Sequence, residues 1–362
     1  MNSRKPQQTL ILFACIVHML FASCSKNNTI TNQGHPNGDT GITIFLPPGN
    51  KSPNLFDLSK ICFGKDGAKW LAGYQAIYRF DGTNWTIFNN SDLPELNNLS
   101  VTKMACGPDG TIYILGLSTT FGPGSTTLIV YKQGVWSSSI LPFMPDVFQV
   151  DPVTGDLYFL EANNIDKIFR YKGTGSLGTE ASYDSFDYAG YNVEDFIVYR
   201  GKAYISFNQA GFADSVDGDQ SGLLVDSLGY NRTVYNYPDT SLHLDFHPMF
   251  SADGKKICML GETTWWIIST THAPLSLYFF NSGSWDSAIT LASSITNQFI
   301  LYGKDGTAWF GGYPDGLVSY FNGQYTSHPF NIRYAGTITD MAIDAGDTIW
   351  IASSNTGLIR FK

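Results

Sequence analysis

A seven-residue phrase recurs near the two ends of this chain and limits the folds that it can adopt. Gly-Lys-Asp-Gly-Ala-Lys-Trp at residues 64–70 returns at 303–309 as Gly-Lys-Asp-Gly-Thr-Ala-Trp. Weaker copies place a turn glycine at intervals of 40 to 53 residues, at Gly67, Gly110, Gly155, Gly201, Gly254, Gly306 and Gly346. The chain from 41 to 362 therefore reads as one tandem array.

Short apolar runs with strand composition surround each turn glycine, as in 111–115 and 203–207. A bulky residue follows three positions after the glycine, as Trp70, Tyr113 and Trp309 do. A period of 40 to 50 residues built from short strands is typical of propeller blades. We expect each aromatic to fill the gap between neighbouring sheets, because a single four-stranded blade cannot bury both of its faces.

A second turn signal recurs in phase with the first one. Segments 80–85, 131–136, 280–285 and 321–325 each read as a turn between two outer strands. Only two strands fit after Gly346, and the run 41–46 is suited to complete that last blade. We predict an all-β, seven-bladed β-propeller over residues 41–362, closed by an N-terminal strand, with six or eight blades as alternatives.

The first 24 residues resemble a bacterial lipoprotein signal peptide. Arg4 and Lys5 form a positive region, an apolar stretch follows, and Phe21-Ala22-Ser23-Cys24 is a small-residue cleavage site. The resemblance implies that Cys24 is lipidated and that residues 25–40 form a flexible tether. Ser25 in the next position implies the outer membrane, with the propeller facing either the periplasm or the exterior. An uncleaved membrane anchor is the alternative, but the apolar stretch is short for one.

Cysteine content and charge limit the chemistry further. Beyond the signal, Cys62, Cys106 and Cys258 lie in apolar strands, and we interpret them as buried thiols rather than a disulfide or a nucleophile. Without residues 1–24 the chain has 20 basic and 31 acidic residues, a net charge of −11. Such a surface excludes nucleic acid as a partner and leaves membrane association to the lipid anchor.

Several repeats resemble known propeller families. The phrases that start at Asp66 and Asp305, and the last copy from Asp347 to Phe361, resemble the two-component-regulator propeller repeat. The segment 248–257 is similar to the WD40-like repeat of TolB-type periplasmic propellers. These resemblances imply architecture and an envelope location, but a fold shared by many functions implies no reaction.

A calcium loop is one candidate site. Asp217, Asp219 and Ser221 have the one-three-five oxygen spacing of such a loop, glycine follows at position six, and Asp226 is the later acid. Bound Ca²⁺ is thus the one possible cofactor. The alternative is a solvated acidic loop. We interpret the recurring Asp66, Asp109, Asp253 and Asp305 as turn formers and not as ligands.

A second candidate combines histidine and aromatic residues. His243, Asp245 and His247 alternate, so on a strand they share one face and could bind a ligand or metal, or instead form structural hydrogen bonds. Trp265 and Trp266 do not follow the repeat and could form a platform for a sugar or a protein. The non-repeating insertions 118–126, 209–222 and 263–274 are the favoured binding loops.

These observations favour a binding role over catalysis. We expect a monomeric, lipid-anchored envelope propeller that engages a protein or glycan partner through its insertions. The alternative is a carbohydrate-active lyase or glycosidase with its site at the central channel. An enzyme would need acids or histidines with perturbed pKa values that converge on one mouth of that channel. No residue is assigned a catalytic role from the sequence.

Overall fold

The computed structural model describes most of the propeller region and part of the segment before it. The described residues are 29–30, 41–48, 58–118, 125–161, 164–208, 221–228, 231–236, 244–250, 257–263, 276–281, 283–286, 289–290, 299–312, 316–328, 338–354 and 356–361. All statements below concern these residues.

The described strands form seven antiparallel sheets, numbered here in chain order. Sheet 1 contains β3 (Lys60–Phe63), β4 (Lys69–Gly73), β5 (Ala76–Phe80) and β6 (Trp85–Asn89); sheet 2 contains β7 (Leu99–Cys106), β8 (Ile112–Ser118), β9 (Ser125–Lys132) and β10 (Val135–Ile140). Sheet 3 contains β11 (Pro145–Val150), β12 (Leu157–Glu161), β13 (Asn164–Tyr171) and β14 (Tyr183–Asp187); sheet 4 contains β15 (Asn192–Tyr199), β16 (Lys202–Asn208), β17 (Ser221–Asp226) and β18 (Arg232–Asn236).

The remaining sheets follow the same meander. Sheet 5 contains β19 (Leu244–Phe250), β20 (Ile257–Thr263), β21 (Ser276–Asn281), β22 (Ser284–Trp285) and β23 (Ile289–Thr290); sheet 6 contains β24 (Phe299–Tyr302), β25 (Ala308–Gly312), β26 (Gly316–Phe321) and β27 (Gln324–His328). Sheet 7 contains β28 (Ile338–Ile343), β29 (Ile349–Ser353) and β30 (Gly357–Phe361), extended by β2 (Ile42–Phe45) and β1 (Thr29–Ile30). Two short 3₁₀ helices, η2 (Pro94–Asn98) and η3 (Glu180–Ser182), interrupt connections.

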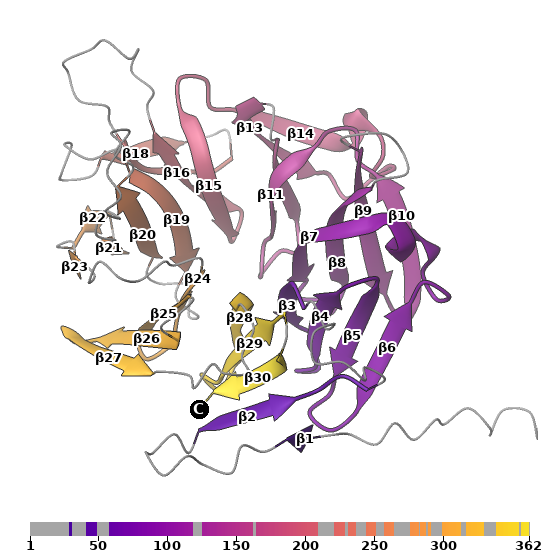
Figure 1. Ribbon diagram of the computed structural model, residues 1–362. Helices are drawn as coiled ribbons and strands as arrows, with labels where there is room; N and C mark the ends of the chain where they lie inside the picture. Colours follow the sequence, from indigo (N-terminus) through magenta and orange to yellow (C-terminus); the bar gives the residue numbers. More distant parts are fainter. Residues whose placement is uncertain are drawn as a thin grey trace, which may run out of the picture.

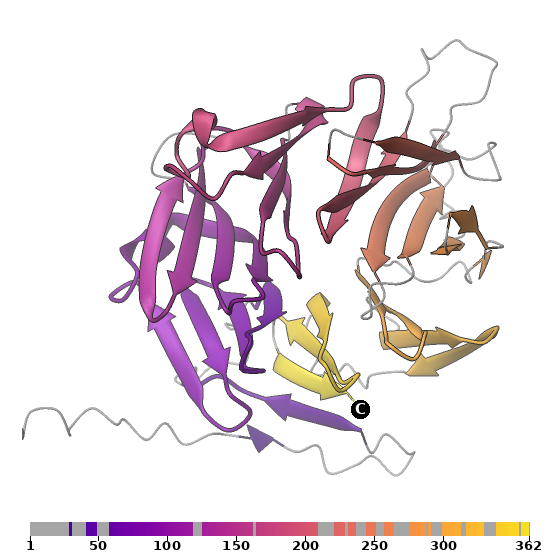
Figure 2. The same cartoon turned by 180° about the vertical axis from the view of Figure 1, so that it is seen from behind.

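The sheets are arranged as a ring around a central axis (Figures 1 and 2). The first strand of each sheet contacts the first strands of its two neighbours, in the cyclic order β3, β7, β11, β15, β19, β24, β28 and back to β3. The successive strands of a sheet then lie progressively farther from the axis. The all-β, propeller class predicted from the repeats is confirmed.

The turn chemistry predicted from the repeated phrase is also confirmed where the structure describes it. Asp66 Oδ1 accepts the Ala68 amide at 3.1 Å, and Asp109 Oδ1 accepts the Thr111 amide at 2.9 Å. Asp305 makes the equivalent bond. These bonds replace backbone pairing at the end of each first strand. Asp253, the fourth predicted turn former, lies outside the described residues.

The last repeat corrects the choice of turn glycine. Its left-handed residue is Asp347, with φ of 57°, where Gly67 of the first repeat has φ of 78°. Aspartate is one of the few side chains that tolerate this conformation. The bulky residue three positions after it is consequently Trp350, in place of the Ile349 expected from Gly346.

The periodic aromatic residues pack between sheets as predicted. Trp70 of sheet 1 is 4% exposed and belongs to a cluster with Ile112, Ile114 and Ile129 of sheet 2. Tyr158 of sheet 3 is packed in the same way against the sheet that follows it. Burial of these side chains between sheets supplies the main driving force for ring assembly.

The predicted closure by an N-terminal strand is confirmed. β2 pairs antiparallel with β30, so residues far apart in the sequence share one sheet, as Figure 1 shows. Phe45 at the end of β2 lies 4.8 Å from the ring of Phe80 in sheet 1 and 5.8 Å from that of Trp350 in sheet 7. The same strand thus completes the last sheet and fills the junction between the last sheet and the first.

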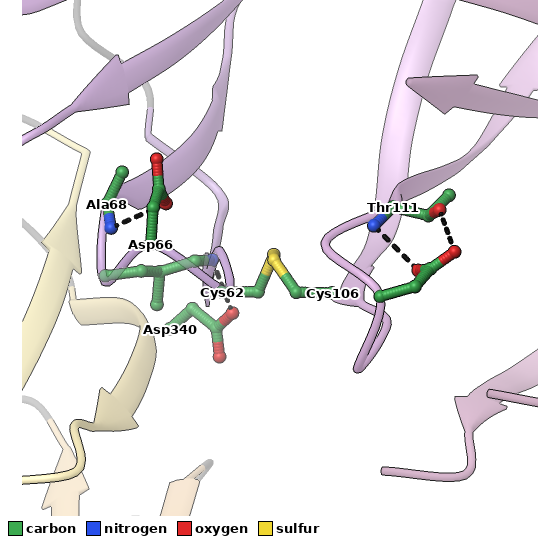
Figure 3. The surroundings of a disulfide bond; sticks show 8 residues. Cys62, Asp66, Ala68, Cys106, Thr111 and Asp340 are labelled. Carbon is green, nitrogen blue, oxygen red and sulfur yellow. Dashed lines mark hydrogen bonds between the residues drawn. A yellow bond between two sulfur atoms is a disulfide. The ribbon is translucent and has the colours of Figure 1, made fainter. Parts of the chain in front are cut away.

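A disulfide joins the innermost strands of sheets 1 and 2, which contradicts the prediction of buried free thiols for these two cysteines (Figure 3). Cys62 of β3 and Cys106 of β7 have Cα atoms 5.9 Å apart, within the range that a disulfide requires. The two cysteines occupy facing positions on neighbouring inner strands, a relation that cannot be read from either strand alone. Cys258 lies in β20, and its side chain is not among those that the structure describes, so its predicted burial remains a prediction.

Loss of the disulfide should destabilise the propeller. The bridge closes a segment with a sequence separation of 44 residues, so the variant Cys62→Ser/Cys106→Ser should lose about 4 kcal/mol in free energy of unfolding. Urea denaturation followed by tryptophan fluorescence measures this loss. A reductant should lower the wild-type midpoint and leave the double variant unchanged. Equal stability of both proteins, with or without reductant, would contradict the bridge.

Candidate functional site

The strand topology gives the ring two chemically different faces. In each antiparallel meander, the first-to-second and third-to-fourth connections lie on one face, here called the turn face. The second-to-third connections and the passages to the next sheet lie on the opposite face, here called the insertion face. All three predicted binding insertions are second-to-third connections, because they follow β8, β16 and β20. The described strands on either side of each insertion end and begin at the insertion face.

Charged residues hold equivalent positions on the first strands of four sheets. Bulges interrupt the first strands of sheets 2, 4 and 7 just before Lys103, Asp195 and Asp340. Lys60 holds the corresponding place in sheet 1, opposite Ala72. The three residues after a bulge therefore hold equivalent positions on their inner strands, where a bulge re-aims the side chain. Lys60, Lys103 and Asp340, which interact electrostatically, are named the inner ring.

Asp340 holds sheet 7 against sheet 1 from the channel side. Its Oδ2 accepts the backbone amide of Ile61 at 2.9 Å (Figure 3). Its Oδ1 accepts the amide of Met341 at 3.0 Å. The hydroxyl of neighbouring Thr339 donates to the carbonyl oxygen of Leu58. An inner strand has an unpaired edge toward the axis, and these bonds satisfy part of that edge.

Burial shifts the pKa values of Asp340 and Lys60 in the directions that favour their neutral forms. It raises the pKa of the Asp340 carboxyl above its ordinary value, although the positive charge of Lys60 acts in the opposite direction. Burial likewise lowers the pKa of the Lys60 ammonium, against the attraction of Asp340, and Lys103 lowers it further. An acid–base pair requires pKa shifts in these two directions, so Lys60 and Asp340 are candidates for one.

The sequence pattern did not single out the inner ring, although a positional signal exists. Lys60, Lys103 and Asp340 each stand four residues before the residue that opens the first turn of their sheet, namely Gly64, Gly107 and Asp344. Charged residues at this place interrupt otherwise apolar strands. These three residues come near one another only because the ring brings their strands together. A single repeat of the sequence does not reveal that arrangement.

The predicted histidine and tryptophan residues are only partly described. Asp245 and His247 lie in β19, the first strand of sheet 5, as expected, and their register positions face Glu262 and Leu260. They are two residues apart on this strand. His243, Trp265 and Trp266 lie outside the described residues, as do most of the insertion residues. The prediction of a ligand site there remains a prediction.

The predicted calcium loop must lose its fourth ligand. Ser221 and Asp226 are the first and last residues of β17, so they lie about 16 Å apart along an extended strand. No single ion reaches both, since calcium–oxygen distances are about 2.4 Å. Asp226 is fully buried and instead accepts the Tyr188 hydroxyl at 3.0 Å and the Arg232 Nε–H at 3.3 Å.

The remaining members of that loop, Asp217 and Asp219, lie outside the described residues. Within the described ranges, no group of three or more His, Cys, Asp or Glu side chains is arranged to hold a metal ion. Nor does that part of the chain contain a helix long and apolar enough to cross a membrane. Calcium binding by the 217–222 segment remains a prediction.

Comparison with known proteins supports the fold. No family model matches the chain, and no curated protein matches it. Among solved structures, a streptogramin B lyase has 14% identity and a TM-score of 0.57, over 85% of this chain and 94% of that one. YCF48 bound to a D1 peptide has 14% identity and a TM-score of 0.55, over 86% and 93%.

A regulator supplies the third comparison. The extracellular domain of a putative hybrid two-component system from B. thetaiotaomicron has 14% identity and a TM-score of 0.50, over 89% of this chain and 42% of that one. The repeat resemblance to such regulators thus has a structural counterpart. At these identities the likeness establishes the propeller fold alone, and the similar proteins differ widely in what they do.

The Asp340 contact gives a pH-dependent prediction. Its folded-state pKa is raised, so ionisation favours the unfolded chain and stability falls as pH rises above the ordinary carboxyl pKa. Asp340→Asn should cost about 1–3 kcal/mol near pH 4 through lost acceptors, and this cost should shrink toward neutral pH. Urea denaturation across pH measures it.

Asp81→Asn is the matched control for the pH experiment. Backbone amides of Asn84 and Thr83 lower the pKa of the exposed Asp81 carboxyl, so its stabilising contribution is lost as pH falls through the lowered pKa. The cost of Asp81→Asn should therefore grow with pH, opposite to that of Asp340→Asn. Parallel pH trends in the two variants would contradict the assignment for Asp340.

Proposed function

We propose that this chain is a lipid-anchored envelope propeller that binds a protein or glycan partner through the insertion face. The observation that carries the proposal is topological. The three insertions that break the repeat all follow second strands and leave from one face. Loops on a rigid scaffold are the usual carriers of specificity.

The rest of the ring is suited to act as a rigid scaffold for these loops. A strand from the N-terminal segment completes sheet 7, Asp340 joins sheets 7 and 1 inside, and a disulfide joins sheets 1 and 2. These links fix the sectors on either side of the closure. A fixed base reduces the entropy lost when its loops bind a partner.

We propose seven blades, one for each hydrogen-bonded sheet, over the six- and eight-bladed alternatives. The cyclic contacts of seven first strands support this number. The signal peptide, lipidation at Cys24 and an outer-membrane location form part of the same proposal. They rest on residues 1–25, and the solved extracellular regulator domain of similar fold is consistent with an envelope location.

Capture from native membranes tests the insertion face. Photocrosslinking should yield a defined adduct with the wild type, and Trp265→Ala/Trp266→Ala should weaken partner binding about 30-fold and reduce the yield accordingly, since a hot-spot tryptophan contributes about 2 kcal/mol or more. Tyr325→Ala is the matched control, because Tyr325 is a 44% exposed aromatic residue on outer strand β27. An adduct unchanged in the tryptophan variant, or lost equally in the control, would contradict the proposal.

Acyl labelling and membrane fractionation test the proposed lipid anchor in the same preparation. Cys24→Ser should abolish acyl labelling and move the protein from the membrane to the soluble fraction, because two or more acyl chains are needed for stable anchoring. Circular dichroism should remain unchanged, since Cys24 precedes the propeller region. Retention in the membrane without label would contradict the lipid anchor and leave the insertion-face experiment interpretable.

The second candidate is a carbohydrate-active lyase or glycosidase with its site in the channel. The specific observation in its favour is Lys60, whose pKa is lowered by burial at the level of the inner ring. A lysine of lowered pKa can act as a general base near neutral pH. Against it, both oxygens of its partner Asp340 already accept backbone amides, as a structural group does.

Lys60→Met separates the two candidates. An enzyme of this kind should release reducing ends or unsaturated sugars from a panel of acidic and neutral polysaccharides, and the variant should lower kcat about 100-fold. The binding proposal expects no turnover by either protein and an unchanged crosslinked adduct. Turnover that depends on Lys60 would replace the proposed function by the enzymatic one.

A further inference from the structure

An arginine lies across the strand pair from the periodic aromatic residue in sheets 1, 3 and 7. These arginines are Arg79, Arg170 and Arg360. In the first two sheets a carboxylate neutralises the arginine, since Arg79 pairs with Asp66 at 2.5 Å and Arg170 pairs with Asp184 at 2.6 Å. The ring therefore contains two complete arginine–carboxylate pairs with which Arg360 can be compared.

In sheet 7, both positions that could supply the acid carry other residues. The acid of sheet 1 comes from the first turn, where the equivalent residue is Gly346, because Gly64 and Asp344 open their turns with the same backbone bonds. The acid of sheet 3 comes from the fourth strand, directly opposite the arginine. In sheet 7 the residue opposite Arg360 is Thr43 of β2. Neither glycine nor threonine provides a carboxylate.

Arg360 is consequently a cation without a counter-charge. Its Nη2 donates to Thr43 Oγ1 at 3.1 Å, and its Nε is buried without an acceptor. No carboxylate of the described residues lies within ion-pair distance of it. A guanidinium keeps its charge at every physiological pH. A half-buried charge of this kind is costly until an anion pairs with it.

A second cation faces the same junction between sheets 7 and 1. Lys69 opens β4, and its Nζ lies 4.2 Å from the centroid of the Trp350 ring. Trp350 is the residue opposite Arg360. Burial lowers the pKa of the Lys69 ammonium; Asp344 opposes this, and the positive charge of Arg360 adds to it. The two cations therefore interact, and in the described part of the chain Lys69 also has no carboxylate at ion-pair distance.

The acids that act on Lys69 are already bonded elsewhere. Asp344 Oδ1 accepts two backbone amides of its own turn at 2.8 and 3.0 Å, and its Oδ2 accepts the Trp350 indole N–H at 2.9 Å. Asp66, which acts more weakly on Lys69, is paired with Arg79. The junction thus presents a guanidinium and an ammonium to which these carboxylates are not bonded.

The donors lie together at the turn-face ends of three strands. Lys69 is the first residue of β4, Arg360 is the next to last of β30, and Thr43 is the second of β2. All three residues are half-buried. They are therefore recessed between the two sheets and still reach solvent, as a binding site for a small ion requires.

We propose that this junction binds the phosphate group of a small soluble ligand. The phosphate oxygens accept from the Arg360 guanidinium and the Lys69 ammonium, and the Thr43 hydroxyl, which already accepts from Arg360, donates to a third oxygen. Two cations and a hydroxyl suit a phosphate dianion, whereas a carboxylate has two oxygens and one charge. The ligand thereby supplies the charge that Asp66 and Asp184 supply in sheets 1 and 3. The site is on the turn face, so this proposal and the partner-binding proposal can fail separately.

Titration calorimetry with inorganic phosphate tests the site at an ionic strength held constant with chloride. The wild type should bind phosphate, and Arg360→Gln should weaken binding about tenfold or more, because it removes a charge-assisted hydrogen bond. Arg170→Gln is the matched control, since Arg170 has its own acid and does not need the ligand. No binding by the wild type, unchanged affinity in Arg360→Gln, or equal losses in both variants would each overturn the proposal.

Thr43→Asp tests the site without removing a cation. Aspartate at this position lies opposite Arg360 as Asp184 lies opposite Arg170, so it should supply the charge internally and abolish phosphate binding. Thr43→Asn, which adds no charge, should retain most of the affinity. Phosphate binding that persists in Thr43→Asp would contradict the site, and this variant keeps the proposal testable even if Arg360→Gln does not fold.

Two further ligands distinguish a soluble phosphate from a lipid headgroup. Glycerol phosphate should bind as inorganic phosphate does. Vesicles of phosphatidylglycerol should retain Cys24→Ser, which lacks the proposed anchor, no better than vesicles of phosphatidylcholine, because a flat bilayer does not reach recessed cations. Retention that depends on Arg360 would assign the site to a membrane phosphate and overturn the soluble ligand.

Discussion

The junction between the last sheet and the first is the constraint on which the rest of the ring depends. Each sheet is covered by its neighbours, so a single open junction would expose two apolar faces and two strand edges. The chain secures this junction twice. On the outside, β2 pairs with β30 and places Phe45 between Phe80 and Trp350; on the inside, Asp340 and Thr339 bond to the backbone of sheet 1.

Much of this arrangement can be read from the sequence because it depends on local chemistry. The turns need glycine or aspartate at fixed places, and the aromatic residues follow at fixed spacing, so Gly67, Asp109 and Trp70 reveal their roles one repeat at a time. Closure was also predictable, since an incomplete last repeat and an extra strand at the start are complementary. Each of these inferences requires only the period and the strand pattern.

The predictions that the structure corrected, and the features that the sequence did not predict, have a different physical origin. The Cys62–Cys106 bridge and the inner ring depend on which side chains of neighbouring inner strands face one another, and that register is set by the ring. Asp347 replaced glycine because a turn requires a conformation and not a residue type. Asp226 matched a calcium spacing, but the spacing assumed a loop and the chain forms a strand there.

Departures from the repeat therefore carry more functional information than the repeat itself. Gly64 and Asp344 occupy the same place in two otherwise similar turns, and the turn carboxylate comes from Asp66 in sheet 1 and from Asp344 in sheet 7. Its second oxygen accepts from Arg79 in the first case and from the Trp350 indole in the second, so the turn is kept while its outer contact changes. The same logic applies to the insertions, which lengthen three second-to-third connections while the turns opposite them remain short. Because the framework is fixed by closure, such local changes can alter binding on either face without altering the ring.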